Sequence, residues 1–352
     1  MKIPKRYKFV GGRIIKTGIA VFVTASICHL LNWPAMFAVI TAIVTIEPTA
    51  ADSIKKAFIR FPASAIGAAF SILFTFIFGD SPLSYTLVTV CTIIACTKLK
   101  LYDGMLVATL TGIAMITTVH DQYVSSFFIR LGTTSTGLIV SSLVNLLVIP
   151  PKYSQTITSG IHTLFMNAGD ILYKRGNGLF DDPFNEKELQ QAFEKLINDI
   201  EKMRKLCHYQ KEEWRFHRSN REDIREYLYV YKKLTILQHI AYHIGNFIFL
   251  PSHHLETDQQ KTEMVKSAIQ SLRRIFCDEK FHIQEEDQAI LKEMTEWFSE
   301  QRSLKTIEEL LPEHHHHIST ETTILYELIS IYDLVEELSH IHDLEIRHKT
   351  GT

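Results

Sequence analysis

The hydrophobic positions of the chain gather in its first 150 residues, where six long apolar runs follow one another between short polar separators. The separators carry turn or charge signals such as Glu47-Pro48 and His120-Asp121. A helix needs about 20 mainly apolar residues to cross a bilayer, with a range of about 17–25. We therefore expect an all-α membrane domain over residues 1–151, a six-helix bundle with transmembrane spans at about 14–31, 33–46, 59–78, 83–97, 103–119 and 124–149.

The rest of the chain, residues 152–352, has the spacing of surface helices. From Leu189 to Leu206, for example, apolar residues recur every three or four positions with charged residues between them. This predicts a second domain, an α-helical bundle. Further helices are expected at 153–175, 221–249, 257–277, 286–311 and 320–347, with breaks at Gly176-Asn177-Gly178, Asp182-Pro183, Pro251-Ser252 and Pro312.

The charge of the chain changes sign at the same point. Residues 1–151 carry 12 Lys and Arg against 5 Asp and Glu, and residues 152–352 carry 25 against 34. These opposite halves exclude a single soluble globule and a disordered chain. The basic residues lie in the N-terminal tail and after the second and fourth runs, whereas 30–34, 79–82 and 119–123 have none. The positive-inside rule therefore predicts a multi-pass cell-membrane protein with both termini and the helical bundle in the cytoplasm.

An internal repeat relates the two halves of the membrane domain. When residues 33–73 are aligned with 103–143, ten of 41 positions are identical, including Arg60 with Arg130 and Gly67 with Gly137. Each copy holds three spans, an odd number, so the second copy must be inverted relative to the first. Inverted three-helix repeats are typical of secondary transporters, in which the substrate path lies at the repeat interface.

Small residues recur four positions apart on the third and sixth runs. In lipid, such residues let helix backbones approach one another closely. We predict that they form packing faces, and the functional alternative is that the helices slide or rock across them. The residues are Ala63, Gly67, Ser71, Thr133, Gly137 and Ser141.

Four charged residues are candidates for substrate binding or gating. Arg130 is expected about two turns into the sixth run, within or near the membrane edge, and Arg60 at the cytoplasmic end of the third run. Each arginine can attract a substrate carboxylate, or can snorkel to the interface and contact lipid phosphate. Glu47 closes the second run, and Asp52-Ser53 offers an N-cap for the next helix. Proton transfer by Glu47 or Asp52 is the alternative to these loop and cap roles.

Residues 38–67 resemble the aromatic acid exporter family, which lies within the fusaric acid resistance superfamily of bacterial membrane proteins. The shared pattern is an apolar helix, then Glu47-Pro48-Thr49, Ser53 and Arg60-x-x-Ala63-Ser64-x-x-Gly67, where the family often has Gly-Thr at the small pair. The resemblance covers about 1–150, and the helical tail is similar to that of short Gram-positive members. It implies export of aromatic carboxylates driven by an ion gradient. Because larger relatives hold two such units, it also implies a homodimer.

No enzyme, cofactor or metal site is expected. The run His314–His317 follows Pro312 in a predicted loop, and consecutive histidines rarely build a preorganised metal site. Glu337-x-x-His340 has the spacing of di-iron bundles but occurs once. The chain has no phosphate-binding loop, nucleophile elbow, C-x-x-C pair or zinc-protease motif, and the acidic second half argues against nucleic acid binding.

Two functional hypotheses remain open from the sequence. The first is a secondary transporter that exports small organic, aromatic anions across the lipid bilayer by alternating access. The second is a non-transporting membrane anchor whose cytoplasmic bundle serves assembly or regulation. They differ in whether Arg130 faces a hydrated cavity or the lipid and its interface.

Overall fold

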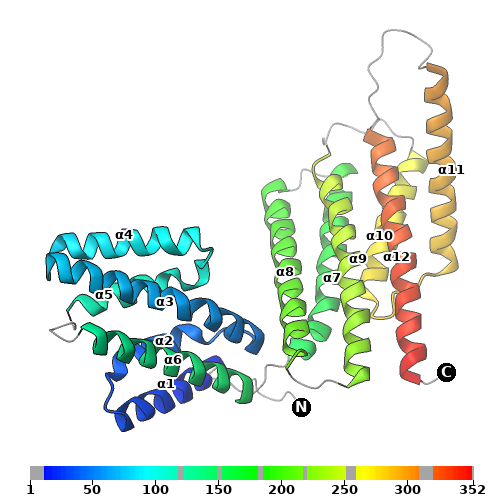
Figure 1. Cartoon of the computed structure of the whole chain (residues 1–352). Coiled ribbons are helices and arrows are strands. Elements are labelled where there is room, and N and C mark those ends of the chain that lie inside the picture. The colour runs from blue at the N-terminus through cyan, green and yellow to red at the C-terminus, as the bar shows by residue number, and fades with distance from the viewer. Residues whose placement is uncertain are drawn as a thin grey trace. The chain divides into compact units, whose positions relative to one another are not determined.

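The computed structural model describes residues 12–117, 123–148, 153–180, 185–216, 220–250, 259–308 and 320–350. Within these ranges the chain forms twelve α-helices and one 3-10 helix, with no strand (Figure 1). The prediction of an all-α chain is therefore confirmed. Contacts divide the chain into two units, one built from residues 1–152 with 209–218, the other from 153–208 with 219–352.

The first unit contains helices α1 to α6. Among the described residues, α1, α3 and α6 are long and apolar enough to cross a membrane. The other helices of this unit are apolar but shorter. The bounds are α1 Gly12–Leu30, α2 Ala35–Thr45, α3 Ala50–Phe78, α4 Pro82–Lys98, η1 Tyr102–Gly104, α5 Met105–Ile116 and α6 Tyr123–Leu147.

Helices α2 and α5 are about half as long as a helix that crosses a bilayer. They have 11 and 12 residues, and at about 1.5 Å per residue they extend roughly 16–18 Å, against a hydrocarbon core of about 30 Å. The runs 33–46 and 103–119, which are predicted to cross the bilayer, thus contain described helices that are shorter than a bilayer-spanning helix. Pro34 precedes α2 and Pro48 follows it, and neither can occupy a helix interior without loss of a hydrogen bond.

Helix α3 begins nine residues before the predicted span 59–78. The three charged residues Asp52, Lys55 and Lys56 interrupt the apolar run but not the helix. The N-cap is Thr49, whose hydroxyl accepts the Asp52 N–H at 3.0 Å, rather than the predicted Asp52-Ser53. The helix ends at Phe78, and its C-cap is Gly79, where a φ of 62° favours glycine.

The packing of the first unit follows the sequence repeat. A shift of 70 residues carries α1 onto α4, α2 onto α5 and α3 onto α6. Helix α3 packs on α4 and α5, while α6 packs in the same manner on α1 and α2, and α3 also contacts α6. The last helix of each repeat, α3 or α6, is therefore held by the first two helices of the other repeat.

The close approaches between the repeats run through small residues. A Cβ atom on Gly67 would lie 2.1 Å from the carbonyl oxygen of Ala108, and one on Gly137 would lie 2.4 Å from that of Ala38. These four residues form two repeat-related pairs, since Ala108 follows Ala38 by 70 positions. The six residues of the predicted packing faces are all buried, namely Ala63, Gly67, Ser71, Thr133, Gly137 and Ser141.

The second unit contains helices α7 to α12. Helix α7 packs on α9 and α10, and α12 packs on α9, α10 and α11. The predicted break at Gly176-Asn177-Gly178 is wrong, because α7 continues through it. Gly176 serves packing instead, since its Cβ would lie 2.5 Å from the Ile269 side chain. The bounds are α7 Tyr153–Phe180, α8 Glu186–Glu213, α9 Arg221–Ile248, α10 Gln259–Cys277, α11 Glu285–Glu308 and α12 Thr320–Thr350.

A buried carboxylate fixes the start of α11 against α10. Asp287 accepts the backbone N–H of Gln284, which precedes the helix, at 2.7 Å, and also binds Ser271 and Arg274 of α10. Burial alone would raise the pKa of the Asp287 carboxyl, but the hydrogen bonds from Arg274, Ser271 and the Gln284 N–H lower it overall. The second unit is thus joined by charged contacts as well as by its apolar core.

We predict that Gly67→Ala and Gly137→Ala each destabilise the first unit by about 1–3 kcal/mol, because the new methyl group must push two backbones apart. The measurement is the thermal unfolding midpoint of the purified protein in detergent. Gly18→Ala is the matched control, since a Cβ there meets no atom within 4 Å in the described part of the chain. Equal midpoints for Gly67→Ala and Gly18→Ala would contradict the close helix crossing.

Candidate functional site

Arg60 joins three segments of the first unit through one guanidinium group. Its Nη2 donates to Glu47 Oε1 at 2.8 Å, its Nη1 to the Val44 carbonyl at 3.2 Å, and its Nε to the Asp103 carbonyl at 3.2 Å. Val44 lies in the last turn of α2, and Asp103 lies in η1, directly before α5. The planar fork of an arginine suits this task, because its donors point in several directions at once. Arg60 therefore links the C-terminal end of α2 to the segment directly before α5.

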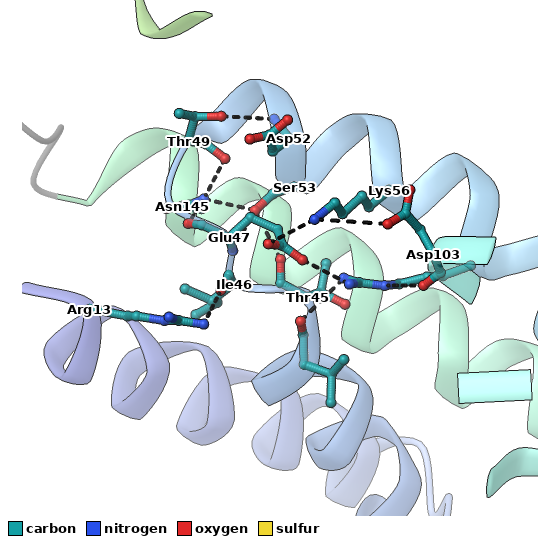
Figure 2. A network of polar contacts seen from close by, with 12 residues as sticks. Arg13, Thr45, Ile46, Glu47, Thr49, Asp52, Ser53, Lys56, Asp103 and Asn145 are labelled. Carbon is teal, nitrogen blue, oxygen red and sulfur yellow. Dashed lines mark hydrogen bonds and ion pairs between the residues drawn. The ribbon is translucent and has the colours of Figure 1, made fainter. Parts of the chain in front are cut away.

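Glu47 is the carboxylate that pairs with Arg60, and it also binds a second cation. Its second oxygen, Oε2, lies 3.1 Å from Lys56 Nζ, and Lys56 in turn lies 4.0 Å from the Asp103 carboxylate. The side chain of Glu47 is 14% exposed and that of Arg60 is 7% exposed. Figure 2 shows Glu47, Lys56 and Asp103 close together near the link between α2 and α3, and Asp52 lies in the first turn of α3.

The backbone of the same link is held by Asn145 of α6. Its Nδ2 group donates to the carbonyls of Glu47 and Thr49, both at 3.0 Å, and to Ser53 Oγ at 2.7 Å. Its Oδ1 accepts from Lys16 Nζ of α1 at 2.8 Å (Figure 2 shows Asn145 beside Thr49 and Ser53). Asn145 and Lys16 are 1% and 6% exposed. Sequence reasoning missed both residues, although a polar side chain near the end of an apolar run was the available signal.

Arg130 occupies the repeat-related position on α6 and is only 6% exposed. Its Nη2 donates to Thr111 Oγ1 of α5 at 2.8 Å, and its guanidinium carbon lies 3.8 Å from the centroid of the Phe37 ring of α2. Its Nε and Nη1 are buried with no hydrogen-bond partner among the described residues. Arg130 thus lies between the two half-length helices as a cation with two open donors.

The repeat explains why the two arginines differ. The residue 70 positions after Glu47 is Thr117, so the second repeat has no carboxylate at the place where the first has its ion-pair partner. Phe37 and Thr111, which contact Arg130, are both uncharged. A buried guanidinium is costly unless an anion compensates it. Arg130 is therefore a buried cation whose contacts among the described residues include no carboxylate.

A chain of hydroxyl groups lies between the arginines. Ser64 Oγ is 3.2 Å from Thr111 Oγ1 and 3.3 Å from Thr134 Oγ1. Ser64 and Thr134 are repeat-related, and Ser64 is the central residue of α3. Arg60 and Arg130 each lie four residues before this contact, a rise of about 6 Å along their helices. Arg60 is therefore not at the helix end, as predicted, but one turn from the middle.

The predicted site residues do not form a single cluster. Glu47 and Arg60 are in direct contact, whereas Arg130 lies in its own surroundings, and Asp52 is placed in the first turn of α3. Among the described residues no group of three or more His, Cys, Asp or Glu is arranged to hold a metal ion. The run His314–His317 lies outside the described residues.

We predict that Asn145→Leu lowers the stability of the protein by at least about 2 kcal/mol, because buried groups of Lys16, Ser53 and the α2–α3 link lose their partner. Thr136→Val is the control on the same helix, since the Thr136 hydroxyl donates to the Gly132 carbonyl within α6. Thermal unfolding in detergent is the measurement. A midpoint for Asn145→Leu that equals the Thr136→Val midpoint would show that the α2–α3 link does not depend on Asn145.

Comparison with known proteins places this chain in a family. Residues 8–148 match the family described as aromatic acid exporter family member 1. Over its whole length the chain is similar to UPF0421 proteins, with 41% identity to one from Bacillus cereus over 96% of this chain and 95% of that protein. The identity is 37% to one from Oceanobacillus iheyensis (97% and 98%) and 36% to one from Staphylococcus epidermidis (93% and 96%). The chain therefore belongs to the UPF0421 proteins, membrane proteins with an aromatic acid exporter family domain.

Proposed function

We propose that this protein is a secondary transporter that exports small organic anions, aromatic carboxylates among them, by alternating access. The observation that carries the proposal is Arg130, a buried cation with two unsatisfied donors between two half-length helices. The match to the aromatic acid exporter family supports the same class of substrate.

The proposed architecture is a pair of inverted three-helix repeats in the membrane. Three helices per repeat make the second copy upside down if each segment changes the direction of the chain. In transporters of this kind, short or interrupted helices at corresponding positions of the two halves indicate the binding site. Helices α2 and α5 are such a pair, and Arg130 contacts both through Phe37 and Thr111.

The chemistry around Arg130 suits a carboxylate that carries an aromatic ring. A carboxylate can accept two hydrogen bonds from one guanidinium, and such charge-assisted bonds are about twice as strong as neutral ones. The Nε and Nη1 groups of Arg130 have no hydrogen-bond partner among the described residues, and each can donate to a carboxylate oxygen. Phe37 already stacks on this cation and offers an apolar surface to the rest of the ligand.

The remaining parts of the proposal follow from charge and from the family. Lys and Arg gather at one end of the first unit, which we assign to the cytoplasm of the bacterial cell, with both termini and the second unit on that side. The protein acts without enzymatic chemistry, and the functional form is a homodimer. The helical second unit supports dimerisation or gating.

We predict that Arg130→Gln slows efflux of a preloaded aromatic carboxylate about 10- to 100-fold, since hydrogen bonds to a charged group contribute about 1.5–3 kcal/mol. The measurement is efflux of labelled benzoate, salicylate and cinnamate from cells with matched amounts of protein in the membrane. Arg130→Lys keeps the charge without the planar fork and should give an intermediate rate. Lys98→Gln, which removes an exposed cation at the end of α4, is the control and should export normally.

Two results would count against the transporter. Normal efflux by Arg130→Gln would remove Arg130 from the anion path. Absence of efflux by the unmodified protein for every acid would favour the other hypothesis, a membrane anchor whose cytoplasmic bundle serves assembly or regulation.

A further inference from the structure

We infer that Glu47 is the proton-coupling group of this transporter, and that its protonation releases Arg60 so that the two repeats can exchange conformations. This inference rests on the proposed function. In each cycle the Glu47 carboxylate binds one proton from the outer side, becomes a neutral carboxyl, and returns the proton to the cytoplasm. One anion leaves in the opposite direction, and the protein itself is unchanged at the end.

The inference starts from the position of Glu47 between the repeats. Glu47 binds Arg60 and Lys56 directly, and Arg60 also holds the end of α2 and the segment before α5. A movement of α2 relative to α5 must therefore break contacts of Arg60. The ionised Glu47 opposes that movement, because separation of a largely buried ion pair leaves both charges uncompensated.

The second step is the difference between the repeats. In inverted-repeat transporters the two halves exchange conformations between the inward-open and outward-open states. Arg60 would then adopt the surroundings that Arg130 has here, with no carboxylate bound from its own repeat. Glu47 would be left without its main partner, and a proton on its carboxyl removes that cost. The second repeat needs no such step, since it has Thr117 in place of a carboxylate.

Other charged groups around Glu47 are consistent with a carboxylate that holds and releases a proton. Two further cations lie nearby on α1: Arg13 donates to the carbonyl of Ile46, and Lys16 binds Asn145. The direct partners Arg60 and Lys56 are the cations that favour the ionised form of Glu47. Three further carboxylates belong to the same part of the first unit. They are Asp103 beside Lys56, Asp52 in the first turn of α3, and Glu213, which accepts the Ala50 N–H at 2.8 Å. They favour proton uptake once Arg60 has moved away.

The test uses the full-length purified protein in liposomes with labelled benzoate as the probe and protein-free liposomes as the baseline. One assay measures benzoate counterflow without a pH gradient, and the other measures benzoate accumulation driven by a pH gradient. Glu47→Gln mimics the permanently neutral carboxyl. We expect it to exchange benzoate at a rate that no longer changes with pH, and to lose at least tenfold of the gradient-driven accumulation.

Asp80→Asn is the matched control, because it removes the same charge from an exposed carboxylate just beyond the far end of α3, 20 residues after Arg60, and it should accumulate benzoate like the unmodified protein. Gradient-driven accumulation by Glu47→Gln at the normal level would overturn the inference, and so would loss of its counterflow. An internal pH dye supplies a second measurement that needs no variant: benzoate export by the unmodified protein must move protons inward. Lack of counterflow by the unmodified protein would instead reject the transporter itself.

Discussion

A guanidinium group buried among apolar helices requires a compensating partner, and this requirement organises the first unit. Without water to solvate it, such a charge is stable only beside an anion or several well-placed acceptors. Arg60 has both, since it binds the Glu47 carboxylate and two carbonyl oxygens. Arg130, at the equivalent place, binds one hydroxyl and stacks on one ring. The arginine at this repeat position therefore links several segments in the first repeat, whereas in the second repeat it keeps two donors without a partner among the described residues.

The packing around the two arginines leaves their polar contacts to decide how the helices are arranged. Helices in lipid gain little from apolar burial, so they associate through close backbone contact and buried hydrogen bonds. The contacts of Gly67 with Ala108 and of Gly137 with Ala38 are of this kind. Such surfaces present backbone rather than interlocking side chains, and a small displacement breaks few contacts. Polar groups, above all those of Arg60 and Asn145, then decide which arrangement of the short helices is stable.

The sequence could predict the parts of this design that are local or repeated. The 70-residue repeat indicated the arginine pair and the small-residue faces, and the positions of Gly67 and Gly137 in the structure follow that pattern. It could not predict the lengths of α2 and α5, because an apolar run does not reveal where helical hydrogen bonding stops. Nor could it predict that Lys16 and Asn145 meet, since 129 residues separate them and each alone resembles an ordinary polar residue near a helix end.

The hydroxyl chain at the centre of the unit shows how little separates the two repeats. Ser64 and Thr134 are repeat-related, and their hydroxyl oxygens lie 3.3 Å apart. From there the chain continues through Thr111 to Arg130, whereas Thr41, the repeat partner of Thr111, donates to the Phe37 carbonyl of its own helix. The repeats thus share their helix packing and differ in a few polar contacts.

A switch between two such arrangements requires new partners for a handful of groups rather than a new core, which is the usual condition for two states of similar free energy. If the protein alternates in this way, Glu47 in one repeat and Thr117 in the other make the two states chemically distinct. One state then contains the Glu47–Arg60 ion pair, and the other requires a proton on Glu47. A proton gradient can drive such a cycle because only one of the two states binds the proton.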